Sequence, residues 1–166
     1  MIAFAFVVMA VLATSAFGQD QLFTDPNVQY TFALPNAEWR IVTRPSATTA
    51  NVECVYGDRS QGYFSVRRLT VAKDAIMADV IQDEKDKLRF LPGYVSEKEE
   101  NFNGRIRGSV IGYEFVQSGR NMQGRYYFLR ANDTTVYLLR FTGPRGKLDL
   151  IRNQTDSIAR TFTVKQ

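Results

Sequence analysis

The residue types that carry most enzyme chemistry are scarce in this sequence. Its 166 residues include no histidine and a single cysteine, Cys54. A Ser-His-Asp triad, a Cys-His pair and a histidine-containing zinc site are therefore all ruled out. Histidine is also the usual general base near neutral pH. The sequence thus predicts a protein that binds rather than catalyses, with no catalytic residues, no metal and no cofactor.

The single cysteine also rules out a disulfide within the chain. Cys54 lies in the segment 52–56, Val-Glu-Cys-Val-Tyr, whose residues are typical of a β-strand. This context favours a small, buried apolar side chain. The alternative is a reactive or partner-linked thiol, because an odd cysteine in an exported protein leaves that option open.

Arginine and tyrosine side chains alternate with apolar residues through several predicted strands. Such a set can form a basic, aromatic surface for an anionic partner, a lipid headgroup or a polyanionic glycan. It can also consist of strand ends whose long side chains reach into solvent. The formal charge of +4 is too small to indicate a nucleic-acid binder. The candidate binding residues are Arg105, Arg107, Arg125, Arg140, Tyr126 and Tyr137.

Acidic residues give two further candidates. Glu84 lies within the apolar arc of a predicted helix. We expect it to pair with a nearby arginine or to lie at an opening in the packing, and the alternative is a pocket that raises its pKa. The other acidic residues lack the spacing of an EF-hand calcium loop, which favours a solvated acidic surface. They are Asp79, Asp83, Asp86, Glu97, Glu99 and Glu100.

The N-terminal segment has the features of a signal peptide. Ile2–Leu12 is an unbroken apolar run, and the small residues Ala16 and Gly18 fit a cleavage site before Gln19. Cleavage after Ala16, an uncleaved anchor close to the membrane and a buried core segment are the alternatives. The run is short for a membrane span, which needs about 20 apolar residues. We therefore expect a secreted or periplasmic protein whose mature part, residues 19–166, is a single domain.

Alternating apolar residues predict a sheet-rich mature chain. Asn103-Gly104 predicts a two-residue hairpin turn, because both positions tolerate a positive φ. Several strands carry apolar residues on both alternating sets, so the sheet should need cover on both faces. The predicted strands span residues 29–34, 39–43, 51–56, 62–71, 94–102, 105–117, 124–130 and 134–141, with a short one at 161–164.

Two segments have helical spacing instead. In residues 74–91 the apolar side chains fall in one arc, Asp74 can cap the start, and Pro92-Gly93 ends the helix. Residues 147–160 form the second helix, and its apolar side chains share one face. The predicted fold class is α+β: an antiparallel sheet flanked by helices on both faces, an α/β/α sandwich.

The order of several motifs resembles the PsbP-like and Mog-like superfamily. The segment 30–35, Tyr-Thr-Phe-Ala-Leu-Pro, precedes Trp39, and the mid-chain helix follows. The later matching motifs are Gly93-Tyr94, Phe102-Asn103-Gly104, Gly112-Tyr113-Glu114-Phe115, Thr135-Val136-Tyr137-Leu138 and Thr161-Phe162. The resemblance covers nearly all of the mature chain. It implies an antiparallel sheet sandwiched by helices.

Members of this superfamily are mostly non-enzymatic. They include extrinsic PsbP proteins of photosystem II, Ran-binding Mog proteins and many exported bacterial proteins. Roles assigned to histidines in PsbP have no residue to occupy here, and Ran is not expected to meet an exported chain. The resemblance therefore implies a binding role without identifying the ligand.

Three functions are consistent with these features. The first is an exported, non-catalytic binding or assembly module of the cell envelope, with an envelope protein or an anionic ligand as partner. The second is a carrier of a small molecule or lipid, which should have a pocket of about 300–1,000 Å³. An enzyme that uses carboxylates, lysine or tyrosine is the third, and it should show two titratable groups with opposed pKa shifts in one cleft.

Overall fold

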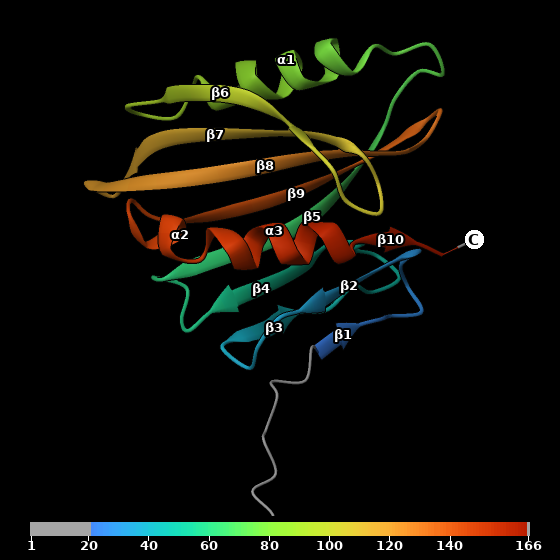
Figure 1. Ribbon diagram of the computed structural model, residues 1–166, viewed down its shortest axis with the longest axis horizontal. Coiled ribbons are helices and arrows are strands. Elements are labelled where there is room, and N and C mark those ends of the chain that lie inside the picture. The colour runs from blue at the N-terminus through green and yellow to red at the C-terminus, as the bar shows by residue number, and fades with distance from the viewer. Residues whose placement is uncertain (1–20, 166) are drawn as a thin grey trace, which may run out of the picture.

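A computed structural model describes residues 21–165, which form ten strands and three helices (Figure 1). The predicted α+β class and its mainly antiparallel sheet are confirmed. The predicted signal peptide and the cleavage site between Gly18 and Gln19 lie outside the described residues. In the described part of the chain, no helix is long and apolar enough to cross a membrane.

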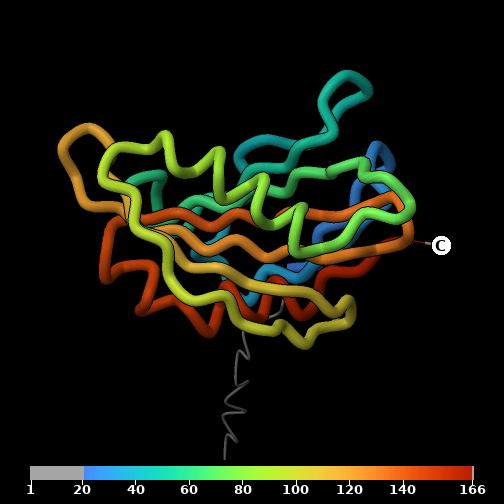
Figure 2. The backbone as a smooth tube through the Cα atoms, turned by 90° about the horizontal axis from the view of Figure 1, so that it is seen from above, coloured from blue at the N-terminus to red at the C-terminus, as the bar shows by residue number. Residues whose placement is uncertain are grey.

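Seven strands form one large sheet in which every neighbouring pair is antiparallel. Their order across the sheet is β3-β4-β5-β9-β8-β7-β6, so the two outer strands are β3 and β6. The strands are β3 (Trp39–Thr43), β4 (Val52–Tyr56), β5 (Gly62–Thr70), β6 (Val95–Phe102), β7 (Gly108–Gln117), β8 (Arg120–Asn132) and β9 (Thr135–Pro144). The connection 44–51 between β3 and β4 projects from the strand layer (Figure 2).

A second, smaller sheet joins the two ends of the described chain. It has the order β1-β2-β10, with β1 at Gln21–Phe23, β2 at Tyr30–Leu34 and β10 at Thr163–Val164. Both outer strands run antiparallel to β2. The sequence predicted β2 and a short strand at 161–164, but it gave no signal for β1.

Three helices accompany the sheets: α1 (Met77–Leu88), α2 (Lys147–Leu150) and α3 (Arg152–Thr161). The predicted helix 147–160 is divided at Ile151, whose φ of −106° departs from helical geometry. Its apolar stripe is nevertheless placed as predicted, because all six of its members are buried: Leu148, Ile151, Thr155, Ile158, Ala159 and Phe162.

The buried side chains form two clusters that use alternate residues of the same strands. Tyr127 and Leu129 of β8 belong to the first cluster, together with residues of β2, α2 and α3. Tyr126 and Phe128 belong to the second, together with residues of α1. We call the two sides of the large sheet the first and second face after these clusters. The small sheet therefore lies on the first face together with α2 and α3. The predicted α/β/α sandwich did not include this small sheet.

The predicted turn at Asn103-Gly104 is wrong. β6 ends at Phe102 and β7 begins at Gly108, so residues 103–107 form a longer connection. The cause is tertiary: the Arg105 amide donates to the Arg160 carbonyl at 3.3 Å, which holds the connection against the end of α3.

The two-residue turn lies instead at Ser118-Gly119, within residues 118–123 that were expected to be a loop. Ser118 has φ +50° and Gly119 has φ +73°, and Gln117 pairs with Arg120 on either side. Positive φ at both central positions matches the twist of a tight hairpin. β8 therefore starts four residues earlier than the sequence predicted.

The predicted start of α1 at Asp74 is also wrong. The helix begins after Ile76, without any side-chain cap, and Ile76 is 64% exposed rather than buried. The Arg130 guanidinium accounts for the delay. It donates to the Ala75 carbonyl at 2.6 Å and to the Lys73 carbonyl at 3.3 Å, and so holds this segment outside the helix.

Candidate binding site on the second face of the large sheet

Part of the second face is left open beside α1. Ile81 and Leu88 of α1 belong to the second cluster, together with residues of β7, β8 and β9. Towards β4 and β5 the same face carries polar side chains in place of apolar ones. One residue from each of four neighbouring strands forms a row across it: Glu53, Ser65, Arg140 and Tyr126. Because neighbouring strands lie about 5 Å apart, these side chains can act on one ligand.

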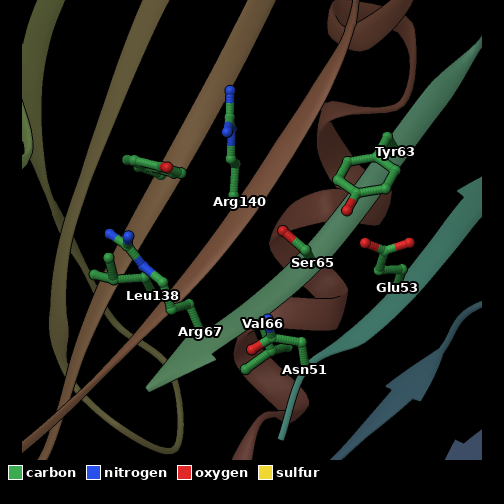
Figure 3. A pocket seen from close by; sticks show the side chains of 9 residues that line it. Asn51, Glu53, Tyr63, Ser65, Val66, Arg67, Leu138 and Arg140 are labelled. Carbon is green, nitrogen blue, oxygen red and sulfur yellow. The ribbon is translucent and has the colours of Figure 1, made fainter. Parts of the chain in front are cut away.

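Two adjoining hollows lie along this row. The first has a volume of about 140 Å³ and is lined by residues including Glu53, Ser65 and Arg67. The second, of about 290 Å³, is lined by residues including Phe115 and Thr142. Tyr63 and Arg140 line both hollows, so we treat the two as one groove. In Figure 3 Tyr63 and Arg67 stand on β5, while Arg140 rises from β9.

An ion pair connects α1 with β5 at the edge of this groove. Glu84 of α1 is only 3% exposed, and its carboxylate contacts the guanidinium of Arg67. Lys87 of the same helix donates to the other carboxylate oxygen at 2.6 Å. The prediction that Glu84 pairs with an arginine is therefore confirmed.

Arg140 is held by two tyrosines. Its Nε donates to the Tyr113 hydroxyl at 3.2 Å, and its guanidinium carbon lies 5.6 Å from the centre of the Tyr126 ring. A glycine makes the first contact feasible. Gly124 lies opposite Tyr113 in the β7–β8 register, and a Cβ at Gly124 would come within 2.1 Å of the Tyr113 ring. The Tyr113 side chain therefore lies directly over Gly124.

The pKa values of the groove tyrosines and of Arg140 are raised further above neutral pH. Burial, followed by a hydrogen bond with Glu53, raises the pKa of Tyr63 to about 12. Burial likewise raises the pKa of Tyr113 and of Tyr126, although Arg140 acts in the opposite direction. Burial alone would lower the pKa of the Arg140 guanidinium, but the adjacent tyrosines outweigh it and raise that pKa. At neutral pH the groove therefore presents neutral phenols beside a permanent cation.

The structure brings two of the six candidate binding residues together. Tyr126 and Arg140 are directly opposite each other in the β8–β9 register. Arg125 and Tyr137 lie on the first face. Arg105 and Arg107 are exposed on the connection between β6 and β7. The candidates are therefore split among three places, and only the pair Tyr126–Arg140 lies in the groove.

On the first face, Arg125 already has protein partners. Its Nε donates to the Tyr127 hydroxyl at 3.2 Å, and its Nη2 forms an ion pair with Asp156 of α3, also at 3.2 Å. Tyr137 lines a separate hollow of about 160 Å³ with Tyr30 and Arg68. Neither residue can reach a ligand in the groove.

The sequence reasoning missed several groove residues. Tyr63, Tyr113 and Glu53 were not among the candidates, because only the strand register, and above all the long-range pairing of β5 with β9, brings them to Arg140. One signal was available: Tyr63, Ser65 and Arg67 alternate with buried Phe64 and Val66. That pattern marks a strand with one polar face.

The acidic residues do not gather into a metal site. Within residues 21–165, no group of three or more Cys, Asp or Glu side chains is arranged to hold a metal ion. Three of these six acidic residues instead form ion pairs: Asp86 with Arg89 at 3.1 Å, Glu99 with Lys85 of α1 at 3.4 Å and Glu100 with Arg152 of α3 at 3.2 Å.

The structure resembles three solved proteins over nearly their whole length. LpqN of Mycobacterium tuberculosis, involved in cell envelope biogenesis, matches with a TM-score of 0.60 and 16% identity, covering 89% of this chain and 92% of that one. The Ran-binding protein Mog1p of Saccharomyces cerevisiae matches with a TM-score of 0.63 and 10% identity, covering 89% and 96%. Cyanobacterial PsbP (CyanoP) of Synechocystis sp. PCC 6803 matches with a TM-score of 0.58 and 14% identity, covering 95% and 98%.

These matches establish the fold. At the level of sequence, no protein-family model and no curated protein matches this chain. The agreement with CyanoP, Mog1p and LpqN nevertheless shows that the chain has a PsbP/Mog-like fold, as the order of its motifs predicted. At identities of 10–16% the likeness speaks for the fold alone.

Proposed function

We propose that this protein is an exported, non-catalytic binding module of the cell envelope that contacts a protein partner through the groove. The observation that carries this proposal is the groove itself, where Tyr63, Tyr126 and Arg140 converge on an uncovered part of the sheet. Tyrosine and arginine are the residue types enriched at the energetic centres of protein interfaces. The proposal takes the large sheet as covered by α1 on the second face and by α3 on the first.

The division of the groove into two small hollows favours a protein partner over a small-molecule ligand. These hollows have volumes of about 140 and 290 Å³, whereas ligand pockets typically span about 300–1,000 Å³. A carrier function remains the second candidate, because the two adjoining hollows together fall within that range and arginine and tyrosine converge on them. Native mass spectrometry of the protein purified from its source cells would reveal a bound ligand mass if this candidate is correct.

The protonation behaviour of the groove supports binding rather than acid–base catalysis. A general acid–base pair needs groups whose pKa values lie near the working pH and are driven apart. The pKa of Tyr63 is raised to about 12, and those of Tyr113, Tyr126 and Arg140 are raised as well. These groups keep one protonation state at neutral pH, which suits a fixed recognition surface.

Two different observations support the proposed location in the cell envelope. The apolar segment Ile2–Leu12 and the small residues before Gln19 predict export. Among the structural neighbours, LpqN is described as involved in cell envelope biogenesis. Fractionation of cells that express the full chain tests this placement, and recovery of the protein in the cytoplasmic fraction would contradict it.

Site-specific crosslinking tests whether a protein partner binds and on which face of the large sheet it binds. A photoreactive phenylalanine analogue placed at Tyr63 probes the groove, and the same analogue at Tyr56 probes the first face from the adjacent strand. Both tyrosines are partly buried, so the two positions are matched. We expect one discrete crosslinked protein from the Tyr63 position only. Loss of that product, or an identical product from Tyr56, would overturn the proposal.

A further inference from the structure

Arg140 differs from the other arginines of the groove in having no carboxylate partner. Arg67 is paired with Glu84, and Arg59 lies 3.4 Å from the Glu53 carboxylate. In the described part of the chain, Arg140 forms no ion pair, and its Nε bonds only to the neutral Tyr113 hydroxyl. Leaving a half-buried guanidinium without an anion sacrifices favourable electrostatic energy, so the site is suited to an anion from outside.

The guanidinium of Arg140 is also held in a fixed orientation before a ligand binds. The Tyr113 contact to Nε and the Tyr126 ring fix the plane of the guanidinium before any ligand arrives. A fixed planar guanidinium loses less conformational entropy when it forms paired hydrogen bonds than a free arginine or lysine does. Both partner tyrosines remain neutral at physiological pH, since burial raises their pKa values, and they leave the positive charge uncompensated.

The charge balance of the groove indicates the kind of anion. Arg59 and Arg67 each contact a carboxylate, so Arg140 is the one of the groove's three lining arginines without an anionic partner among the described residues. A carboxylate carries one negative charge and matches the guanidinium through two parallel hydrogen bonds. A phosphate group carries up to two charges near neutral pH and would require a second free cation.

We propose that Arg140 anchors a single carboxylate of an acidic side chain in a protein segment that lies along the groove. This inference rests on the proposed function and specifies the chemistry of its partner. A segment suits the shape of the site, because the two open hollows meet at Arg140 and Tyr63. Beyond Arg140, Phe115 and Met122 offer apolar contact for the neighbouring residues of the segment.

A blocked peptide provides a direct probe. The tripeptide acetyl-Phe-Asp-Phe-amide carries one carboxylate between two aromatic side chains, and its Asn analogue differs only in that charge. We follow the Nε–H resonance of Arg140 and the backbone amides of β5 and β9 by NMR during titration. The Asp peptide should cause saturable shifts at these positions and bind at least tenfold more tightly than the Asn peptide. Equal binding of the two peptides, or tighter binding of inorganic phosphate, would overturn the inference.

Matched variants connect the binding to Arg140. Arg140→Gln should weaken the Asp peptide at least tenfold. Arg107→Gln removes the same charge from an exposed position outside the groove and should have no effect. Arg140→Lys keeps the charge but loses the planar fork, so it should also weaken binding and serves if the Gln variant folds poorly. Unchanged affinity in Arg140→Lys together with Arg140→Gln would refute the anchoring role.

The two proposals fail in different ways. If the Tyr63 position still crosslinks a partner in Arg140→Gln with undiminished yield, the function stands and the carboxylate anchor is wrong. If no partner crosslinks in the wild-type protein while the Asp peptide still binds at Arg140, the anchor stands and the function is wrong.

Discussion

Gly124 shapes the groove although it has no side chain of its own. The Tyr113 ring lies in the space that any other residue at Gly124 would fill, since an added Cβ would lie 2.1 Å from the ring. From that position the Tyr113 hydroxyl reaches Arg140. A glycine within a strand usually weakens the strand, and it often marks a close approach of this kind.

We therefore expect Gly124→Ala to destabilise the protein by about 1–3 kcal/mol, because Tyr113 must leave its place in a packed core. Urea unfolding measures the change. In a Tyr113→Ala background the same glycine substitution should cost far less, because the clash is gone. If the cost is the same in both backgrounds, Gly124 does not act through Tyr113.

Cys54 is fully buried, as its strand context predicted. Burial raises the pKa of its thiol from 9.0 to about 12. The unfolded chain therefore loses the thiol proton first as pH rises. The stability linked to this group is fully present below about pH 9 and is lost between about pH 9 and pH 12.

From this difference we expect the free energy of unfolding to fall by roughly 2 kcal/mol between pH 8 and pH 10.5 through the thiol alone. Urea titrations across this range measure the fall. The variant Cys54→Ala should lose less stability over the same interval, because it has no thiol to ionise. Equal pH dependence in both proteins would show that Cys54 does not contribute.

At the scale of elements, α1 is joined to β5 by a pair whose two members differ in burial. The Glu84 side chain is buried, while that of Arg67 is 45% exposed. An unpaired buried charge is more costly than an apolar replacement of similar volume. The pair therefore serves mainly to compensate Glu84, with Lys87 as its second partner.

This asymmetry predicts that Arg67→Ala destabilises the protein more than Glu84→Leu does. The arginine variant leaves Glu84 buried with Lys87 alone, whereas the leucine variant replaces the buried charge with an apolar side chain of similar volume. Thermal unfolding of the two variants gives the comparison. A greater loss in Glu84→Leu would mean that the ion pair itself stabilises α1.

The packing of α3 follows more directly from the sequence. Ile158 is fully buried in the first cluster, and Asn153 is exposed on the same helix. We expect Ile158→Ala to lower the free energy of unfolding by about 2–5 kcal/mol. Asn153→Ala should change it by less than about 0.5 kcal/mol. Similar costs for the two variants, measured in urea, would contradict this placement of α3.

Elements with a strong local period were predicted well, and elements defined by distant contacts were not. β3 at Trp39–Thr43 matches its predicted bounds, and the apolar face of α3 was correctly identified. The prediction of a turn at Asn103-Gly104 failed because the connection 103–107 forms a hydrogen bond with the end of α3. No local sequence pattern reveals that contact. The start of α1 failed for a similar reason, since Arg130 lies more than fifty residues away in sequence.

At the scale of the whole molecule, the candidate site depends on strand order. Arg140, Tyr126 and Arg125 were all predicted to belong to one binding surface. Arg140 and Tyr126 lie on the same face of the sheet, whereas Arg125, adjacent to Tyr126 in sequence, faces the opposite side. Alternation along β8 could have separated these two residues. Only the register of β4, β5 and β9 places Glu53 and Ser65 beside Arg140, and nothing in the sequence states that register.

The large sheet ends at β6, a strand whose residues are nearly all exposed. Exposed strand edges can pair with other molecules, and charged residues discourage this. The variant Lys98→Val with Glu100→Val leaves the net charge unchanged and makes β6 more apolar. We expect it to form large assemblies at high concentration, measured by light scattering. Lys98→Ser with Glu100→Ser loses the same two charges and the same ion pair with Arg152 but keeps β6 polar, so it is the control and should stay monodisperse.

The charged residues of β6 also bear on the export that we propose for this protein. A secreted protein must stay soluble without the cytoplasmic chaperones. An unprotected edge strand on a large sheet would favour fibril growth. Lys98 and Glu100 are both exposed, and covering them with a second sheet would cost the free energy of removing two charges from water.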